Sequence, residues 1–196
     1  MKILVLSDTA DKMLWDYLNR ELLEGVELVL ACGDLPSAYL SFLTCFTEAP
    51  ILYVHGNHDQ SYEKKPPEGC ICVEDDIYVY KGVRILGLGG SMRYRNADHM
   101  YTEREMRGRI RKLFWKLLRH KGFDILMTHA PARGIGDQED LPHRGFECFL
   151  KLMDKYHPKY MFHGHVHPEY GIGFQRERDY GSTRVVNVYK RYIVEI

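Results

Sequence analysis

The sequence predicts an α/β fold that begins with a parallel sheet. Apolar runs of strand length recur along the 196 residues, helical patterns separate them in the first third, and polar residues follow the runs directly. A strand–helix–strand–helix–strand order favours right-handed crossovers and parallel pairing. The carboxyl ends of such strands form an edge where open α/β sheets bind ligands, so we expect the functional residues there.

The first third supplies three of these strands. They are expected at Ile3–Leu6, Val26–Ala31 and Ile51–His55. Leucines at helical spacing predict a helix over Asp11–Leu23, and a shorter helix is expected at Ala38–Thr47.

The second half is expected to be more antiparallel. Two apolar runs flank a Lys-Gly turn and predict a hairpin. The expected strands are Ile77–Tyr80, Val83–Leu88, Ile125–Thr128, Tyr160–His163, Ile172–Gln175, Arg184–Val188 and Tyr192–Glu195, and the expected helices are Glu103–His120 and Arg144–Tyr156. No linker, repeat or low-complexity segment divides the chain, so residues 1–196 are expected to form one domain.

Composition argues against several classes of protein. Lys plus Arg total 27 and Asp plus Glu total 27, so no global basic field points to nucleic acid or to an anionic membrane. No apolar stretch approaches the roughly 20 residues of a membrane span. The apolar start is too short for a signal peptide, so we expect a soluble, cytoplasmic protein. The basic face of the helix at 103–120, which includes Arg109, is interpreted as solvated, with nucleic-acid binding as the alternative.

Charged, amide and imidazole groups follow several of the expected strands. Asp8 follows the first strand and Asp34, in "CGD", the second. The others are Asn57, His58 and Asp59 in "GNHD", His129 in "THAP", and His165 and His167 in "HGHVH". Carboxylates gathered at one edge would repel each other and raise their pKa values, whereas a divalent cation removes that conflict.

These residue types are typical of a hard to borderline divalent ion. Carboxylate, amide oxygen and imidazole without thiolate suit Mn²⁺, Fe²⁺, Zn²⁺ or Co²⁺. A structural zinc site more typically recruits cysteines at short spacing, and an all-oxygen magnesium site would not use this many histidines. Two ions that share Asp34 could activate a water for in-line attack on phosphorus.

Taken together, the motifs resemble those of the calcineurin-like metallophosphoesterase superfamily. Its pattern is Asp-x-His, Gly-Asp, Gly-Asn-His-Asp/Glu, a lone His and Gly-His-x-His, and here it extends from Asp8 to His167. The short chain is similar to the compact bacterial phosphodiesterases of that superfamily. The resemblance implies a four-layer α/β/β/α sandwich with metals at the carboxyl ends of the strands, formed by one calcineurin-like phosphoesterase domain over 1–196.

The resemblance also implies a role for each residue. It implies two divalent metal ions, manganese first, with iron, zinc, cobalt or nickel as alternatives. Asp8 and His167 would bind the first ion, Asp34 would bridge, and Asn57, His129 and His165 would bind the second. His58 would protonate the leaving group, since histidine titrates near neutral pH, and Asp59 would orient His58. The implied reaction is hydrolysis of a phosphoester, more specifically a phosphodiester, by a metal-activated water.

One position departs from the pattern. The first histidine of the superfamily falls at Ala10, which cannot bind a metal. Three interpretations stay open: Asp11 or a water fills the gap, the first site is weak or empty, or the site is degenerate and the chain is a binding or scaffold protein. Because His58 and the ligands of the second site remain, we favour an active enzyme.

Two further regions are candidates for substrate contact. Arg93 or Arg95 could reach a phosphate, because the planar guanidinium matches its oxygens. His143 lies on a loop before a helix, and loops of this kind often line clefts. The expected partner is a small-molecule or nucleotide phosphoester, with no membrane; the natural substrate and the oligomeric state stay open.

Overall fold

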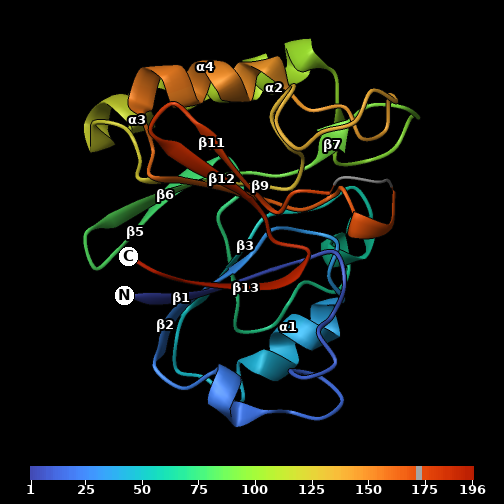
Figure 1. Ribbon diagram of the computed structural model, residues 1–196, viewed down its shortest axis with the longest axis vertical. Helices are drawn as coiled ribbons and strands as arrows, with labels where there is room; N and C mark the ends of the chain where they lie inside the picture. The colour runs from blue at the N-terminus through green and yellow to red at the C-terminus, as the bar shows by residue number, and fades with distance from the viewer. Residues whose placement is uncertain (171–173) are drawn as a thin grey trace.

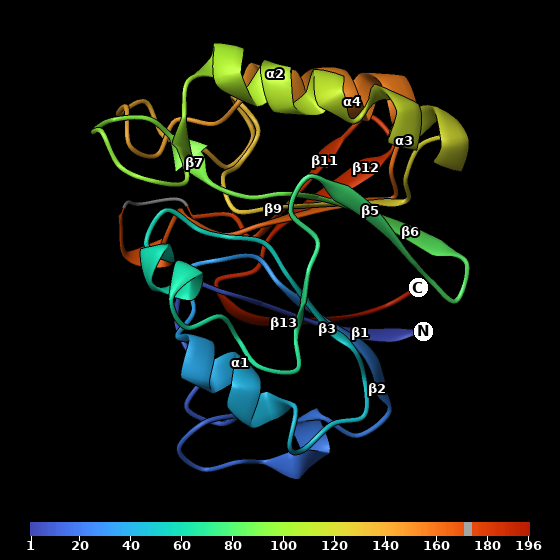
Figure 2. The same ribbon diagram turned by 180° about the vertical axis from the view of Figure 1, so that it is seen from behind.

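The computed structural model describes residues 1–170 and 174–196 and shows two sheets packed face to face between two helical layers (Figures 1 and 2). Helices α2 (Glu103–Lys112), α3 (Phe114–His120) and α4 (Glu147–Tyr156) cover one outer face, and α1 (Ser37–Leu43) covers the other. The expected α/β/β/α sandwich is confirmed. Among the described residues no helix is long and apolar enough to cross a membrane.

The first sheet contains the strands expected in the first third of the chain. Its order is β13-β1-β2-β3-β4, parallel except that β13 runs antiparallel to β1. The strands are β1 (Lys2–Ser7), β2 (Val26–Ala31), β3 (Ile51–Tyr53), β4 (Ile71–Cys72) and β13 (Lys190–Glu195). The carboxyl ends of β1, β2 and β3 therefore meet at one edge.

The second sheet has the order β11-β12-β10-β9-β6-β5. Its strands are β5 (Asp76–Tyr80), β6 (Val83–Leu88), β9 (Ile125–Thr128), β10 (Tyr160–His163), β11 (Glu177–Tyr180) and β12 (Thr183–Asn187). The predicted hairpin is the β5–β6 pair. A separate parallel pair joins β7 (Ser91–Met92) to β8 (Met100–Tyr101). The strand predicted at Ile172–Gln175 begins outside the described residues.

The expectation of a more antiparallel second half is wrong for the centre of this sheet. Strands β6, β9, β10 and β12 are parallel, and only β5 and β11 at the edges run antiparallel. Helices α2 and α3 connect β6 to β9, and α4 connects β9 to β10. Such helical crossovers return the chain in the same direction, so they impose parallel pairing.

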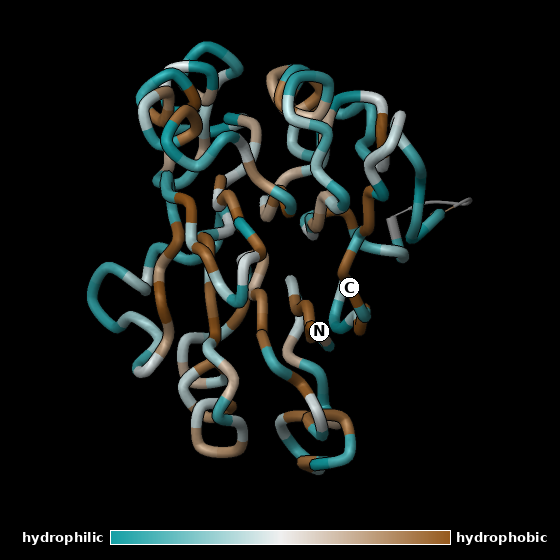
Figure 3. The backbone as a smooth tube through the Cα atoms, turned by 90° about the vertical axis from the view of Figure 1, so that its left-hand side faces the viewer, coloured by the Kyte–Doolittle hydropathy of each residue, from teal (hydrophilic) through white to brown (hydrophobic). Residues whose placement is uncertain are grey.

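Three apolar layers hold the sandwich together. Alternate residues of β1 and β2 point to opposite faces of the first sheet, as the two-residue period requires. The layer between the sheets contains Ile3, Val5, Leu28, Leu30, Phe162 and Val186, all fully buried. The other two layers lie under α1 and under α2–α4. Figure 3 shows the strands as a largely hydrophobic centre between more hydrophilic outer turns.

The helix predicted over Asp11–Leu23 is wrong. The segment forms successive turns and one 3₁₀ turn at Arg20–Leu22. Leu18 has a φ of 39°, which interrupts a right-handed helix. Leu14 is nonetheless fully buried, and Trp15 packs against Tyr39 of α1. The spacing of the apolar residues therefore reflects their burial and not a helix.

The helix predicted over Glu103–His120 is divided. Its amino end carries the capping box of Thr102 and Glu105. At Leu113 the backbone N–H donates to the Ile110 carbonyl three residues back, and this tighter turn separates α2 from α3. Leu113 itself is buried in the core beneath the helices.

Candidate metal centre

The predicted site residues converge from both sheets at one edge of the sandwich. Asp8, Asp34 and Asn57 follow β1, β2 and β3 of the first sheet, and His129 and His165 follow β9 and β10 of the second. They meet at or beside a cavity of about 330 Å³ lined by Asp8, Asp34, Asn57, His58, His165, His167, Tyr94, Pro142 and His143. His129 lies fully buried directly behind Asp34 and Asn57.

Two glycines let the loops of this edge touch. A Cβ at Gly33 would lie 2.4 Å from Gly56 N, and one at Gly56 would lie 2.0 Å from Asp34 Oδ1. Neither distance is sterically allowed, so the loops after β2 and β3 pack through bare backbone. The loop after β10 behaves in the same way, because a Cβ at Gly164 would lie 1.9 Å from Ser7 Oγ.

We expect Gly56→Ala to destabilise the protein by about 1–3 kcal/mol, the usual cost of overpacking. The new methyl group can be accommodated only if Asp34 moves. Gly108→Ala is the matched control, because nothing lies within 4 Å of that Cβ and alanine favours helix α2. Urea unfolding of both variants checks this, and equal stabilities would contradict the packing described here.

Three candidate ligand residues have left-handed backbone. The φ angles are 67° at Asp8, 56° at Asp34 and 68° at His165. Residues other than glycine adopt this region rarely, and such conformations cluster at functional sites. Each follows a strand directly or after one or two residues, so the turn aims its side chain along the sheet edge.

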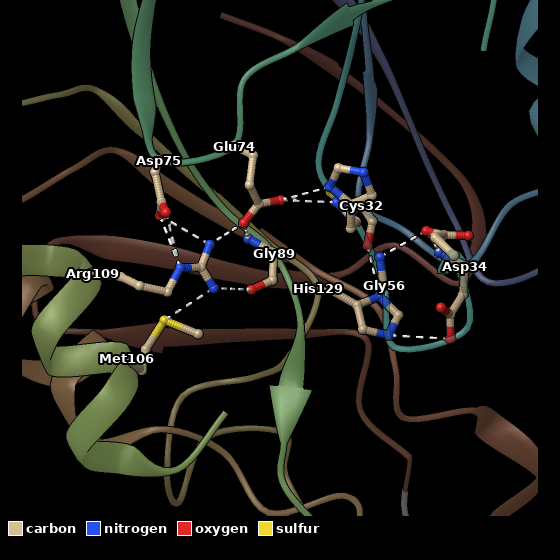
Figure 4. A network of polar contacts seen from close by, with 11 residues as sticks. Cys32, Asp34, Gly56, Glu74, Asp75, Gly89, Met106, Arg109 and His129 are labelled. Carbon is tan, nitrogen blue, oxygen red and sulfur yellow. Dashed lines mark hydrogen bonds and ion pairs between the residues drawn. The ribbon is translucent and has the colours of Figure 1, made fainter. Parts of the chain in front are cut away.

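His129 is oriented so that one ring nitrogen faces oxygen atoms. Its Nδ1–H donates to the Cys32 carbonyl at 2.8 Å, which leaves Nε2 3.3 Å from Asp34 Oδ2 (Figure 4). Nε2 also lies 3.1 Å from Asn57 Oδ1. Although burial opposes the charged form, Asp34 raises the pKa of His129 to about 9. Burial would likewise raise the pKa of Asp34, but His129 and the His58 N–H hold it below its usual range. Either a proton or a metal cation at Nε2 would balance the oxygen atoms that face it.

The histidines after β10 complete the cavity. The His165 N–H donates to Asp8 Oδ1 at 2.8 Å, and its ring Nε2–H donates to the Pro142 carbonyl at 2.8 Å. Burial, and then the nearby His129, lower the pKa of His165 to about 3, so its ring is neutral and Nδ1 keeps a lone pair. His167 Nε2 lies 3.5 Å from Asp8 Oδ1.

These side chains fit a divalent cation. Ligand atoms of Asp34, His129 and His165 all lie within 4.8 Å of one another. Asp8 Oδ2 is buried and has no hydrogen-bond partner among the described residues. A buried carboxylate oxygen without a partner is costly, and a metal ion would satisfy it. The donors are nitrogen and oxygen, which suits manganese, iron, zinc, cobalt or nickel.

Comparison with known proteins agrees with this donor pattern. A profile described as calcineurin-like phosphoesterase matches residues 1–169. The chain belongs to this family. The family implies the use of divalent metal ions. Comparison with curated proteins gives no match.

Solved structures show the same fold as this calcineurin-like phosphoesterase. TT1561 of Thermus thermophilus is 19% identical with a TM-score of 0.65, and the alignment covers 96% of this chain and 89% of that one. GAP50, the anchor in the inner membrane complex of Plasmodium, is 10% identical with a TM-score of 0.56, and the alignment covers 95% of this chain and 70% of that one. At these identities the likeness concerns the fold alone.

Ala10 is the position where this phosphoesterase lacks an imidazole. Its methyl group packs against the apolar layer under the first sheet. The Asp11 carboxylate forms an ion pair with Arg191 at 2.9 Å and accepts a hydrogen bond from Met13 N, and Asp11 is not among the described residues that line the cavity. The structure therefore gives no support to Asp11 as the replacement ligand.

Asp59 contacts backbone rather than the His58 ring. Its Oδ2 accepts hydrogen bonds from Asp34 N at 2.8 Å and Gly56 N at 2.7 Å, and none of the hydrogen bonds described for 1–170 joins it to the His58 imidazole. Burial and the neighbouring Asp34 raise the pKa of Asp59 to about 6. Asp59 therefore holds two loops together, and its role in orienting His58 stays a prediction that no described hydrogen bond supports. The exposed His58 is fixed through its backbone N–H, which donates to Asp34 Oδ1 at 2.7 Å.

The predicted substrate residues lie in different places. His143 lines the cavity, and its ring lies 5.3 Å from the ring of His165. Arg93 instead donates to the Met100 carbonyl and pairs with Glu105 at 3.0 Å, in a neighbouring pocket of about 490 Å³. Tyr94, which the sequence analysis missed, takes the place beside the cavity. No charge or motif in the sequence marks Tyr94 as a residue of the site.

A buried ion pair supports the loop that carries Asn57 and His58. The Glu74 carboxylate accepts hydrogen bonds from His55 N at 3.0 Å and Gly89 N at 2.8 Å, and it pairs with Arg109 (Figure 4). Arg109 also pairs with Asp75 at 2.9 Å and is 9% exposed. The expectation that Arg109 lies on a solvated helix face is therefore wrong, because this side chain reaches under the sheet edge.

Glu74→Gln should destabilise the protein by about 3 kcal/mol at neutral pH, because a buried Arg109 loses one of its two carboxylates. Burial opposes ionisation, but His55 and Arg109 lower the pKa of Glu74 from 4.5 to about 2. A carboxyl group whose pKa is lower in the folded than in the unfolded state stabilises the fold above its unfolded-state pKa. The difference in the free energy of unfolding between wild type and variant should therefore be fully present above pH 4.5 and shrink as the pH falls toward 2. Urea unfolding across pH tests this; a constant difference would contradict it.

Proposed function

We propose that this calcineurin-like phosphoesterase is a metal-dependent phosphodiesterase. The single observation that carries the proposal is the convergence of Asp34, His129 and His165 ligand atoms within 4.8 Å, beside a cavity that His58 also lines. A cation site alone would fit a structural metal. An exposed imidazole on the same cavity adds a group that can move a proton.

The residues of the two sheets would hold two ions. Asn57, His129 and His165 would bind one, Asp8 and His167 the other, and Asp34 would contact both. Manganese fits this mixture of nitrogen and oxygen donors first. When bound, such ions supply Lewis-acid polarisation of phosphate oxygens and of a water.

The chain's own residues would bind and orient the ester. His58 would donate a proton to the leaving oxygen as its bond to phosphorus breaks, so that an alcohol rather than an alkoxide departs. This role is supported by the His58 backbone N–H, which donates to Asp34 Oδ1, and by the position of His58 on the cavity. His143 and Tyr94 line the rim and would contact the ester groups of the substrate. Pro142 fixes the His165 ring through its carbonyl and so keeps the ligand nitrogen turned inward.

A second candidate function is a binding or scaffold role. The alanine at position 10 favours it, because one ligand of the family pattern is missing. The fold is also found in GAP50, the anchor in the inner membrane complex of Plasmodium. The intact set of Asp34, Asn57, His58, His129 and His165 weighs against it.

Hydrolysis of bis-p-nitrophenyl phosphate after Mn²⁺ loading tests the proposal. We expect Mn²⁺-dependent release of nitrophenol, abolished by EDTA, and faster release than from p-nitrophenyl phosphate. Faster monoester cleavage would replace the phosphodiesterase by a phosphomonoesterase. Metal binding without turnover on either substrate would favour the scaffold function.

A further inference from the structure

A groove of about 890 Å³ lies on the outer helical layer, between α2–α3 on one side and α4 on the other. Both ribbon views place these helices side by side on the face away from the first sheet (Figures 1 and 2). The groove and the cavity of the metal centre share no lining residue. It is therefore a separate feature, and it stands whether or not the chain is a phosphodiesterase.

The floor of the groove is apolar. Ile110, Leu117 and Leu152 contribute to it, and Phe114 at its edge is 51% exposed. Next to Phe114, Trp115 is 73% exposed and Leu118 is 58% exposed. Adjoining apolar side chains of this size on a surface are typical of an interaction site. The described part of the chain leaves them uncovered.

Both edges of the groove are basic. Arg104, Arg107 and Arg111 follow one another along α2, and Lys151 and Lys155 lie one turn apart on α4. Arg107 is paired with Glu103 and Glu147. Among the described residues the other four form no ion pair with a carboxylate. Because the whole chain has a net charge of zero, this is a local positive field.

We propose that this groove binds an acidic amphipathic helix of a partner protein. From Glu103 to Leu117 the groove is about 20 Å long at 1.5 Å per residue, the length of roughly four helical turns. Such a helix would place its apolar face on Ile110, Phe114 and Leu152 and its carboxylates against cations on both edges.

Charge and shape disfavour the other occupants. A second copy of the chain docked through the same face would bring its own basic groove edges against the basic edges of the first copy, and the like charges would repel. A nucleic-acid backbone would satisfy the cations but leave the recessed apolar floor uncovered. A lipid head group would use one or two of the five basic side chains, whereas an acidic helix uses both edges along their length.

Fluorescence anisotropy with a labelled peptide tests the proposal on the full chain. The probe is a helical peptide of about five turns with leucine at i, i+3, i+4 and i+7 and glutamate elsewhere. A peptide of the same composition with the leucines scrambled is its control. Arg111→Glu and Phe114→Ala remove a groove contact. Lys112→Glu and Tyr17→Ala are the controls, because neither residue lines the groove and Tyr17 is an exposed aromatic side chain away from the layer of α2–α4. Circular dichroism melts confirm that each variant is folded.

We expect the two groove variants to weaken binding of the leucine-faced peptide at least about tenfold and the two controls less than about twofold. Equal effects of Arg111→Glu and Lys112→Glu, or equal binding of the scrambled peptide, would overturn the proposal in favour of unspecific charge attraction. No binding up to about 1 mM would overturn it as well. A single-stranded oligonucleotide or an anionic phosphatidylglycerol vesicle that displaces the peptide more effectively than unlabelled peptide would reassign the surface.

Discussion

His58→Ala should lower turnover of bis-p-nitrophenyl phosphate by about 10²–10⁴-fold, the usual contribution of a positioned proton donor. The His58 ring is exposed at the cavity, and its backbone N–H, which alanine retains, makes the contact with Asp34. Metal content and stability should therefore stay unchanged. The loss should fall in kcat, because the donated proton matters only as the leaving bond breaks.

His120→Ala is the matched control for this prediction. His120 ends α3 on the outer helical layer, and it is not among the residues that line the cavity of the metal centre. Its turnover should equal that of the wild type. If His58→Ala retains wild-type kcat with bound metal, His58 is not the proton donor.

Asp34→Asn should abolish metal-dependent turnover. Asparagine keeps an oxygen that can accept the His58 N–H but removes the charge that faces His129. Loss of the carboxylate that we propose to contact both ions should weaken metal affinity by more than the roughly 10–100-fold that loss of a supporting group costs. Equilibrium dialysis against Mn²⁺ and bis-p-nitrophenyl phosphate assays on the same sample would measure both effects.

Asp59→Asn is the control variant for Asp34→Asn. Asp59 supports the Asp34 and Gly56 backbone through Oδ2 and supplies no ligand atom to the Asp34–His129–His165 cluster. The affinity of the Asp59→Asn variant for Mn²⁺ should fall by about 10–100-fold at most. If Asp34→Asn keeps more metal or more activity than Asp59→Asn, the assignment of Asp34 as the bridging residue is wrong.

The strand ends could be predicted because they depend on local pattern. Buried parallel strands are apolar runs, and a charged or amide residue directly after such a run marks the edge of the sheet. This pattern therefore predicts the position of Asp8, Asp34 and Asn57 at one edge of the sheet. It also predicts the turns at Gly33 and Gly56. The same logic brought His129 and His165 from later strands to the same place.

Contacts between distant segments could not be predicted in this way. The apolar spacing of Leu14 and Leu18 is compatible with a helix. Packing of the segment on α1 instead favours turns, in which Leu18 has a positive φ. Arg109 reads as one member of a basic helix face until Glu74 and Asp75 are seen beneath it. Arg93 and Tyr94 are neighbours in the chain, and only the tertiary fold decides which one faces the cavity.

The two proposed metal positions should differ in affinity. The position around Asp34, His129 and His165 has more ligands than the position around Asp8 and His167, where Ala10 replaces a histidine. Calorimetric titration of the metal-free wild type and of Asp8→Asn with Mn²⁺ tests this difference most directly. We predict two binding events in the wild type that differ at least about tenfold in affinity, with only the tighter one surviving in Asp8→Asn. Two events of equal affinity, or loss of the tighter event in Asp8→Asn, would contradict the claim.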